Sequence, residues 1–188
     1  HYILPLSHDE VVHLKCSMVE KMPGYQVDKY ANLRGGYTFL FGHSGKKLLF
    51  MGQDFGQERE GSEERELDWF LLGQDLNRGL KDYVKELLEL YRNYPVMYKI
   101  DSDWSGFEWI NADDAQRSIY SFFRKDETGK NRILFILNMT PIEYKDFRVG
   151  VPEAGTYKLL LDSASTKFGG QGSNISRTIR SKDGACDW

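Results

Sequence analysis

The hydrophobic and polar positions of the chain follow two different periods. Up to about residue 96, apolar residues recur at the spacing of amphipathic helices. From about residue 104 onward they gather in short runs that turn residues separate, which is typical of β-strands. The pattern therefore predicts two domains, residues 1–98 and residues 99–188.

Two long helices are predicted in the first domain. Each carries one apolar stripe, and the first ends near Gly42 while Pro95 stops the second. A shorter helical stretch is expected to end near Met22, before Pro23 and Gly24. The stripes consist of Tyr30, Leu33, Tyr37, Leu40 and Phe41 in the first helix and of Leu76, Leu80, Tyr83, Val84, Leu87, Leu88 and Tyr91 in the second.

Two short apolar runs, Tyr2–Leu6 and Lys47–Met51, lie outside these helices. A continuous apolar run is typical of a strand buried on both faces of a parallel sheet. The predicted order is strand, helix, strand, helix, which is that of an α/β fold. Because the chain begins with His1 next to a strand already under way, we expect it to be a piece of a longer protein.

The second domain is predicted to be an antiparallel β-sandwich. Its β-type runs repeat about every 8–12 residues, with turn residues between them. No strand is predicted after Ser181, so we expect the sandwich to be truncated. The predicted strands are Phe107–Ile110, Ser118–Phe123, Arg132–Asn138, Lys145–Val151 and Tyr157–Leu161.

Composition narrows the classes of function. The net charge of −3 offers no basic excess, so we expect no nucleic acid partner. The longest apolar run, Ile133–Leu137, is far shorter than the roughly 20 residues that cross a bilayer, so no membrane partner is expected. Cys16 and Cys186 lack the spacing of metal ligands, which favours free thiols and a cytoplasmic protein. The aromatic content of 14% suits large cores or stacking on sugar rings.

A dense polar cluster, Ser7-His8-Asp9-Glu10, directly follows the first predicted strand. Chemistry in parallel α/β proteins gathers at the carboxyl ends of strands, so this cluster is a candidate active site. His8 and His13 would point about 140° apart on a helix, which does not suit zinc, and we expect no metal and no cofactor. A structural alternative remains open, in which Ser7 or Asp9 caps a helix.

Asp54 follows the second predicted strand. If the two strands are neighbours, about 4.8 Å apart, Asp9 and Asp54 project over one rim and could act as paired carboxylates on a glycoside. The alternative is that Asp54 contacts its own loop. Trp69 suits either a sugar site or the core, and the acidic stretch Glu58–Asp68 is expected to be a solvated loop.

Several motifs follow one another in a fixed order along the chain. They are Leu6–His13, Lys21–Gly24, Gly45–Gly52, Phe55–Gln57, Leu67–Trp69 and Gly106–Ile110. Over essentially the whole chain these motifs resemble the 1,4-alpha-glucan (glycogen or starch) branching enzymes of the alpha-amylase superfamily. The resemblance implies the last two β/α units of a TIM (β/α)8 barrel, with Tyr2–Leu6 and Lys47–Met51 as barrel strands, followed by a C-terminal antiparallel β-sandwich.

The resemblance also implies a reaction. Such enzymes cleave an alpha-1,4 glucan chain and transfer it to a 6-hydroxyl, with retention, through an aspartate nucleophile and a glutamate acid/base. Asp9 corresponds to their third carboxylate, a transition-state stabiliser, and His8 to the histidine beside it. Glu10, Asp54 and Trp69 are further candidates for substrate binding. The pairing of Asp9 with Asp54 as nucleophile and acid is therefore not expected.

The implied substrates are alpha-1,4-glucans such as glycogen, amylose and starch, and the implied partner is the remainder of the same enzyme chain. Because the implied nucleophile and acid/base lie before residue 1, we expect the isolated chain to be inactive. Two residues depart from the family pattern, Leu14 in place of Gly and Gly61 in place of Trp. Two alternatives remain, a non-catalytic glucan-binding or structural fragment and a related hydrolase of the superfamily.

Overall fold

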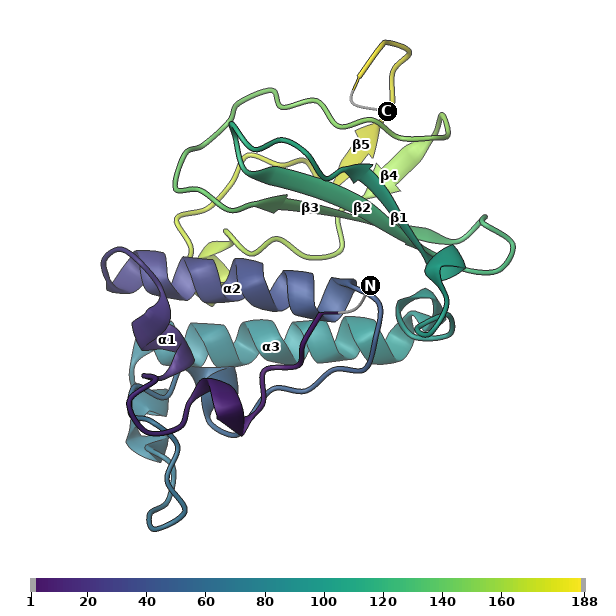
Figure 1. Ribbon diagram of the computed structural model, residues 1–188. Coiled ribbons are helices and arrows are strands. Elements are labelled where there is room, and N and C mark those ends of the chain that lie inside the picture. The colour runs from purple at the N-terminus through teal and green to yellow at the C-terminus, as the bar shows by residue number, and fades with distance from the viewer. Residues whose placement is uncertain (1–2, 187–188) are drawn as a thin grey trace.

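The computed structural model of the chain describes residues 3–186, so the predictions made for Tyr2 and for residues 187–188 lie outside the described residues. Helix α2 lies between helix α3 on one side and a three-stranded sheet on the other (Figure 1). A short helix, α1, precedes α2, and a two-stranded sheet lies near the C-terminal end. The helices are α1 (Met18–Lys21), α2 (Gln26–Gly42) and α3 (Asp75–Asn93).

The two long predicted helices are confirmed. All five stripe residues of α2 are buried, and Leu80, Tyr83, Val84 and Leu87 of α3 are buried against them. Of the other predicted stripe residues, Leu76 and Tyr91 are half-buried, and Leu88, at the edge of the stripe, is 52% exposed. The short helical stretch is reduced to α1, which Ser17 caps through its hydroxyl group.

The two parallel strands predicted in residues 1–98 are reduced to one isolated parallel bridge between Leu6 and Leu49. Leu6 N donates to the carbonyl of Leu48 at 3.2 Å, and Phe50 N donates to the carbonyl of Leu6 at 2.9 Å. A parallel strand that is buried on both faces needs a neighbour on each side. No third strand pairs with these two runs within residues 3–186, and Leu48 and Met51 are 45% and 50% exposed.

The second half is built from antiparallel strands, as predicted. Phe122 of the central strand, β2, lies opposite Trp109 of β1 and Phe135 of β3. The three-stranded sheet consists of β1 (Phe107–Asn111), β2 (Ile119–Lys125) and β3 (Arg132–Asn138), and the two-stranded sheet of β4 (Thr156–Lys158) and β5 (Thr178–Arg180).

One strand predicted for this half is absent, and one observed strand was not predicted. Residues Lys145–Val151 form no strand, because Asp146 adopts a left-handed conformation with φ of 54° that interrupts an extended backbone. Strand β5 was not expected, since all three of its residues are exposed and show no alternation.

An aromatic stack joins the sheet to α2. The rings of Phe107, Phe122 and Phe135 stack in series, with centroid distances of 4.8 and 4.9 Å. The stack reaches the last residue of α2, Gly42, where a Cβ atom would lie 2.7 Å from the ring of Phe135. Glycine is therefore required at this end of α2 by close approach to the ring.

Two buried arginines fasten α2 to the second half of the chain. Arg124 of β2 is fully buried and pairs with Asp101 at 2.8 Å. Arg34 of α2 is 2% exposed and donates to the carbonyls of Ser163 at 2.7 Å and Phe168 at 3.0 Å. The guanidinium of Arg124 also donates to the carbonyls of Gly42, His43, Ile100 and Gly106.

We predict that Arg124→Met lowers the free energy of unfolding by about 3–5 kcal/mol, because it leaves Asp101 charged and buried without its partner. Arg92→Met is the matched control, since Arg92 is exposed on α3. Urea denaturation followed by circular dichroism measures both. Equal midpoints for the two variants would contradict the role given to Arg124.

Candidate functional site

The predicted catalytic cluster lies on a single 3-10 turn, His8–Glu10, directly after the bridge at Leu6. Ser7 caps this turn: its hydroxyl accepts from Asp9 N and donates to Asp9 Oδ2, each at 3.3 Å. The capping alternative is therefore correct for Ser7, and the cap fixes the Asp9 side chain. His8 Nε2 lies 3.2 Å from Asp9 Oδ1.

The Asp9 carboxylate faces solvent. The side chains of His8 and Asp9 are 64% and 70% exposed, and the His8 ring lies beside the Phe50 ring at a centroid distance of 6.2 Å. An exposed carboxylate beside an imidazole can accept hydrogen bonds from hydroxyl groups of a ligand while the imidazole donates or accepts another.

Glu10 points away from this pair, toward α1. Its carboxylate lies 3.3 Å from Lys21 Nζ, and the same ammonium donates to the Glu10 carbonyl. The Glu10 side chain is 44% exposed. The structure therefore gives Glu10 a cation partner next to the candidate site.

Asp54 lies on the 3-10 turn Gln53–Phe55, which follows the second half of the bridge. Its carboxylate forms an ion pair with Lys81 of α3, and its side chain is 29% exposed. The alternative of a contact within its own loop is thus wrong, since the partner belongs to a helix that lies further along the chain. Asp54 and Asp9 thus have different partners, Lys81 and His8.

Trp69 begins the 3-10 turn Trp69–Gly73 that leads into α3. Its ring stacks on Phe55, with a centroid distance of 5.3 Å and an interplanar angle of 29°. It remains 52% exposed. One face of the ring therefore packs on the buried Phe55, and the remaining surface is exposed.

Residues 11–16 link the candidate site to α1, and Glu60 contacts this segment. Cys16 N donates to Glu60 Oε1 at 2.8 Å, and the next residue, Gly61, donates to the Val11 carbonyl at 2.8 Å. The backbone N–H of Cys16 is the main reason that the pKa of Glu60 lies below its usual range. Sequence reasoning missed Glu60, because a stretch of exposed carboxylates shows no pattern that singles out one of them.

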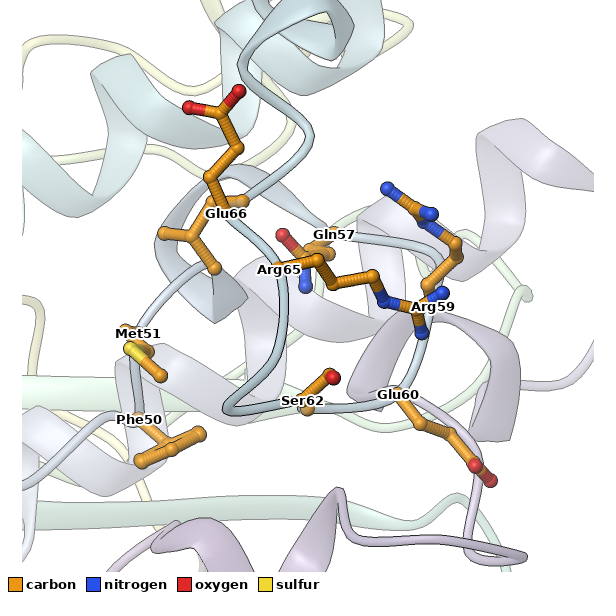
Figure 2. Close-up of a pocket in the computed structure, with 10 residues that line it drawn as sticks. Phe50, Met51, Gln57, Arg59, Glu60, Ser62, Arg65 and Glu66 are labelled. Carbon is orange, nitrogen blue, oxygen red and sulfur yellow. The ribbon is translucent and has the colours of Figure 1, made fainter.

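A shallow depression lies beside this segment, and Figure 2 shows ten residues that line it. Glu60 and Glu66 leave the loop in opposite directions (Figure 2). Arg59 Nε donates to Asp68 Oδ2 at 2.7 Å, and the side chain of Asp68 is only 4% exposed. A Cβ on Gly61 would lie 3.3 Å from the Phe50 ring. Glycine at this position therefore leaves the space beside Phe50 open.

Groups of metal ligands and membrane-spanning helices are both absent from the described part of the chain. No group of three or more His, Cys, Asp or Glu residues suited to a metal ion occurs within residues 3–186. None of the helices in that range is long and apolar enough to cross a membrane.

Leu14 is held in a left-handed conformation, with φ of 68°, although it is 84% exposed. Because glycine adopts this conformation without strain, we predict that Leu14→Gly raises the free energy of unfolding by about 0.5–1 kcal/mol. Val12→Gly is the control, since Val12 lies in the same segment outside the left-handed region and should lose stability. Thermal unfolding measures both, and a lower midpoint for Leu14→Gly would contradict the strain.

Comparisons with known proteins bear on the whole chain. Residues 109–187 match the family described as alpha amylase, C-terminal all-beta domain. The chain is 70% identical over 188 residues, all of its length, to a 1,4-alpha-glucan branching enzyme GlgB of Butyrivibrio fibrisolvens, and spans 29% of that relative. It is 46% identical to the protein of that name from Nitrobacter hamburgensis over 184 residues, which are 98% of the chain and 26% of the relative.

A third relative with that name, from Rubrobacter xylanophilus, is 45% identical over 172 residues, 92% of the chain and 24% of the relative. The chain thus spans less than a third of the length of these relatives. Along its full length the chain is similar to the C-terminal part of the 1,4-alpha-glucan branching enzymes of the alpha-amylase superfamily, and its residues 109–187 match the family model of the alpha amylase C-terminal all-beta domain.

Proposed function

We propose that the chain is part of a 1,4-alpha-glucan branching enzyme, which cleaves an alpha-1,4 glucan chain and transfers it to a 6-hydroxyl to form an alpha-1,6 branch. The observation that carries this proposal is the 70% identity over all 188 residues to a relative named as such an enzyme. Glycogen, amylose and starch are the proposed substrates. The two cysteines are free, which suits the cytoplasm that we propose as its location.

Residues 1–98 are, in this proposal, the last two β/α units of a (β/α)8 barrel, and residues 99–188 are the C-terminal sandwich. The parallel bridge between Leu6 and Leu49 supports it, because neighbouring barrel strands are parallel and each is followed by a helix. Leu4, Leu48 and Met51 are 82%, 45% and 50% exposed. The remainder of the same enzyme chain is the partner that would cover these apolar side chains.

Asp9 acts in this reaction as the transition-state stabiliser. Its exposed carboxylate accepts hydrogen bonds from sugar hydroxyls, and these bonds strengthen as the ring flattens toward the oxocarbenium ion. His8, at 3.2 Å, orients that carboxylate and binds the same sugar. The nucleophile and the acid/base belong to the remainder of the enzyme, so the 188-residue chain alone should neither branch nor hydrolyse starch.

The remaining candidates bind substrate around this pair. Trp69 offers its open surface for stacking on a glucosyl ring, since one of its faces already packs on Phe55. Glu10 and Asp54 each have a lysine partner that fixes the direction of the carboxylate, which leaves the free oxygen lone pairs for sugar hydroxyls.

A chimera tests the proposal. The chain replaces the corresponding 29% of the Butyrivibrio fibrisolvens relative, and new alpha-1,6 linkages are counted after debranching of amylose products. We expect branching by the chimera, and a fall in kcat of roughly 10²-fold or more with Asp9→Asn, because the substitution removes a charged acceptor used in the transition state.

Glu63→Gln is the matched control, since it removes one exposed carboxylate and should leave kcat within about twofold. Release of reducing ends without new branches would identify a hydrolase instead. Full activity with Asp9→Asn would assign Asp9 a structural role, and branching by the isolated chain would overturn the assignment of the missing carboxylates.

A further inference from the structure

The carboxylate of Glu60 lies outside the predicted cluster His8–Glu10, and the backbone of residues 11–16, which follow that cluster, holds it. Glu60 Oε1 accepts a hydrogen bond from Cys16 N at 2.8 Å. Leu14 and Cys16 have φ of 68° and 62°. Left-handed residues that alternate with right-handed ones turn successive backbone N–H groups toward one point, which makes a concave site for an anion.

Segment 11–16 is in turn joined to the Asp9 backbone. Lys15 Nζ donates to the Asp9 carbonyl at 2.8 Å, and Val11, which accepts from Gly61 N at 2.8 Å, closes the 3-10 turn that carries Asp9. Both ends of the segment are therefore held by the consecutive residues Glu60 and Gly61. Any shift of this pair displaces the main chain on either side of Lys15.

The support for Glu60 is itself fixed. The preceding residue, Arg59, pairs with the buried carboxylate of Asp68, and Asp68 N donates to Gln57 Oε1 at 3.1 Å. His13 is a weaker partner: its Nδ1 lies 3.6 Å from Glu60 Oε2, and its side chain is 87% exposed. An ion pair at such exposure contributes little, so the contacts to the backbone of the segment dominate.

We propose that Glu60 is a positioning residue for Asp9 and acts through segment 11–16. The inference rests on the proposed function, in which Asp9 stabilises the transition state. Glu60 touches no substrate in this account. It keeps the 3-10 turn of Asp9 in one place relative to the loop that contains Arg59 and Asp68.

The experiment uses the chimera with the Butyrivibrio fibrisolvens relative. Glu60→Gln removes the charge and replaces one acceptor oxygen with an NH2 group, which donates and cannot accept a hydrogen bond, and we expect kcat to fall about 10–100-fold while KM for amylose stays within about threefold. Glu60→Asp keeps the charge and should recover part of kcat. Glu63→Gln, on the same loop, should leave both parameters unchanged.

A double-mutant cycle separates positioning from a general loss of structure. If Glu60 acts through Asp9, Glu60→Gln should lower kcat by no more than about threefold further when Asp9 is already Asn. The reason is that Asp9→Asn has already removed the carboxylate that Glu60 positions. Equal losses in both backgrounds, or a Glu60→Gln chimera with unchanged kcat, would overturn the inference. So would a Glu60→Asp chimera that melts normally and recovers nothing.

Failure of the proposed function is distinguishable from these results. An unsubstituted chimera that makes no alpha-1,6 linkages overturns the proposed function, and the inference with it. A chimera that branches, but in which Glu60→Gln is silent, overturns the inference alone.

Discussion

The buried guanidinium of Arg124 holds the end of helix α2, the loop around Asp101 and strand β2 in one place. A charge without solvent is stable only when its donors are all used, and here they meet one carboxylate and several backbone carbonyls. Two of these carbonyls belong to Gly42 and His43, at the negative end of the α2 dipole, where a cation is most favourable. The sheet therefore contacts α2 through directional hydrogen bonds from Arg124, which fix the position of β2 relative to the end of α2.

The same charge shapes the groups around it. Burial lowers the pKa of Lys47 to about 8, and Arg124 adds to the shift while Asp101 opposes it. Burial also lowers the pKa of His43, again with a contribution from Arg124. Raising the pH from about 8 to 10 should therefore raise the free energy of unfolding through Lys47. Over that range the folded chain has lost the Lys47 proton, which the unfolded chain still holds. At His43 the folded state is favoured above about pH 6.5 and loses that advantage as the pH falls.

The parts of this structure that the sequence predicts are those in which neighbours in sequence decide the outcome. The stripes of α2 and α3 and the whole of β3 follow from local periodicity, and so does the cap that Ser7 forms on Asp9. Arg124, by contrast, stands in a strand where a charged residue suggests solvent, yet its partners lie 18 to 82 residues away. Glu60 is similar, since its main contact spans 44 residues. Contacts of that kind depend on tertiary structure and leave no local pattern.

The candidate site at Asp9 and the ion pair of Arg124 with Asp101 differ in burial for a physical reason. In the proposed function the Asp9 carboxylate binds sugar hydroxyls and must reach solvent. Ser7, Lys15 and the segment that Glu60 contacts hold Asp9 on the side that faces the protein. Carboxylates that fix structure are buried here: Asp101 together with its cation Arg124, and Asp68 against Arg59, whose side chain is 49% exposed. The proposed chemistry thus lies in the helical half of the chain, and contacts with the β half fix the position of α2.

Native-state hydrogen exchange in increasing urea tests most directly whether the buried arginines join the two halves into one unit. The slowest amides of α2, α3, β2 and β3 should open with the same free energy and the same dependence on urea. Strong protection in β2 and β3, together with a separate opening of α2 and α3 at lower free energy, would contradict the account.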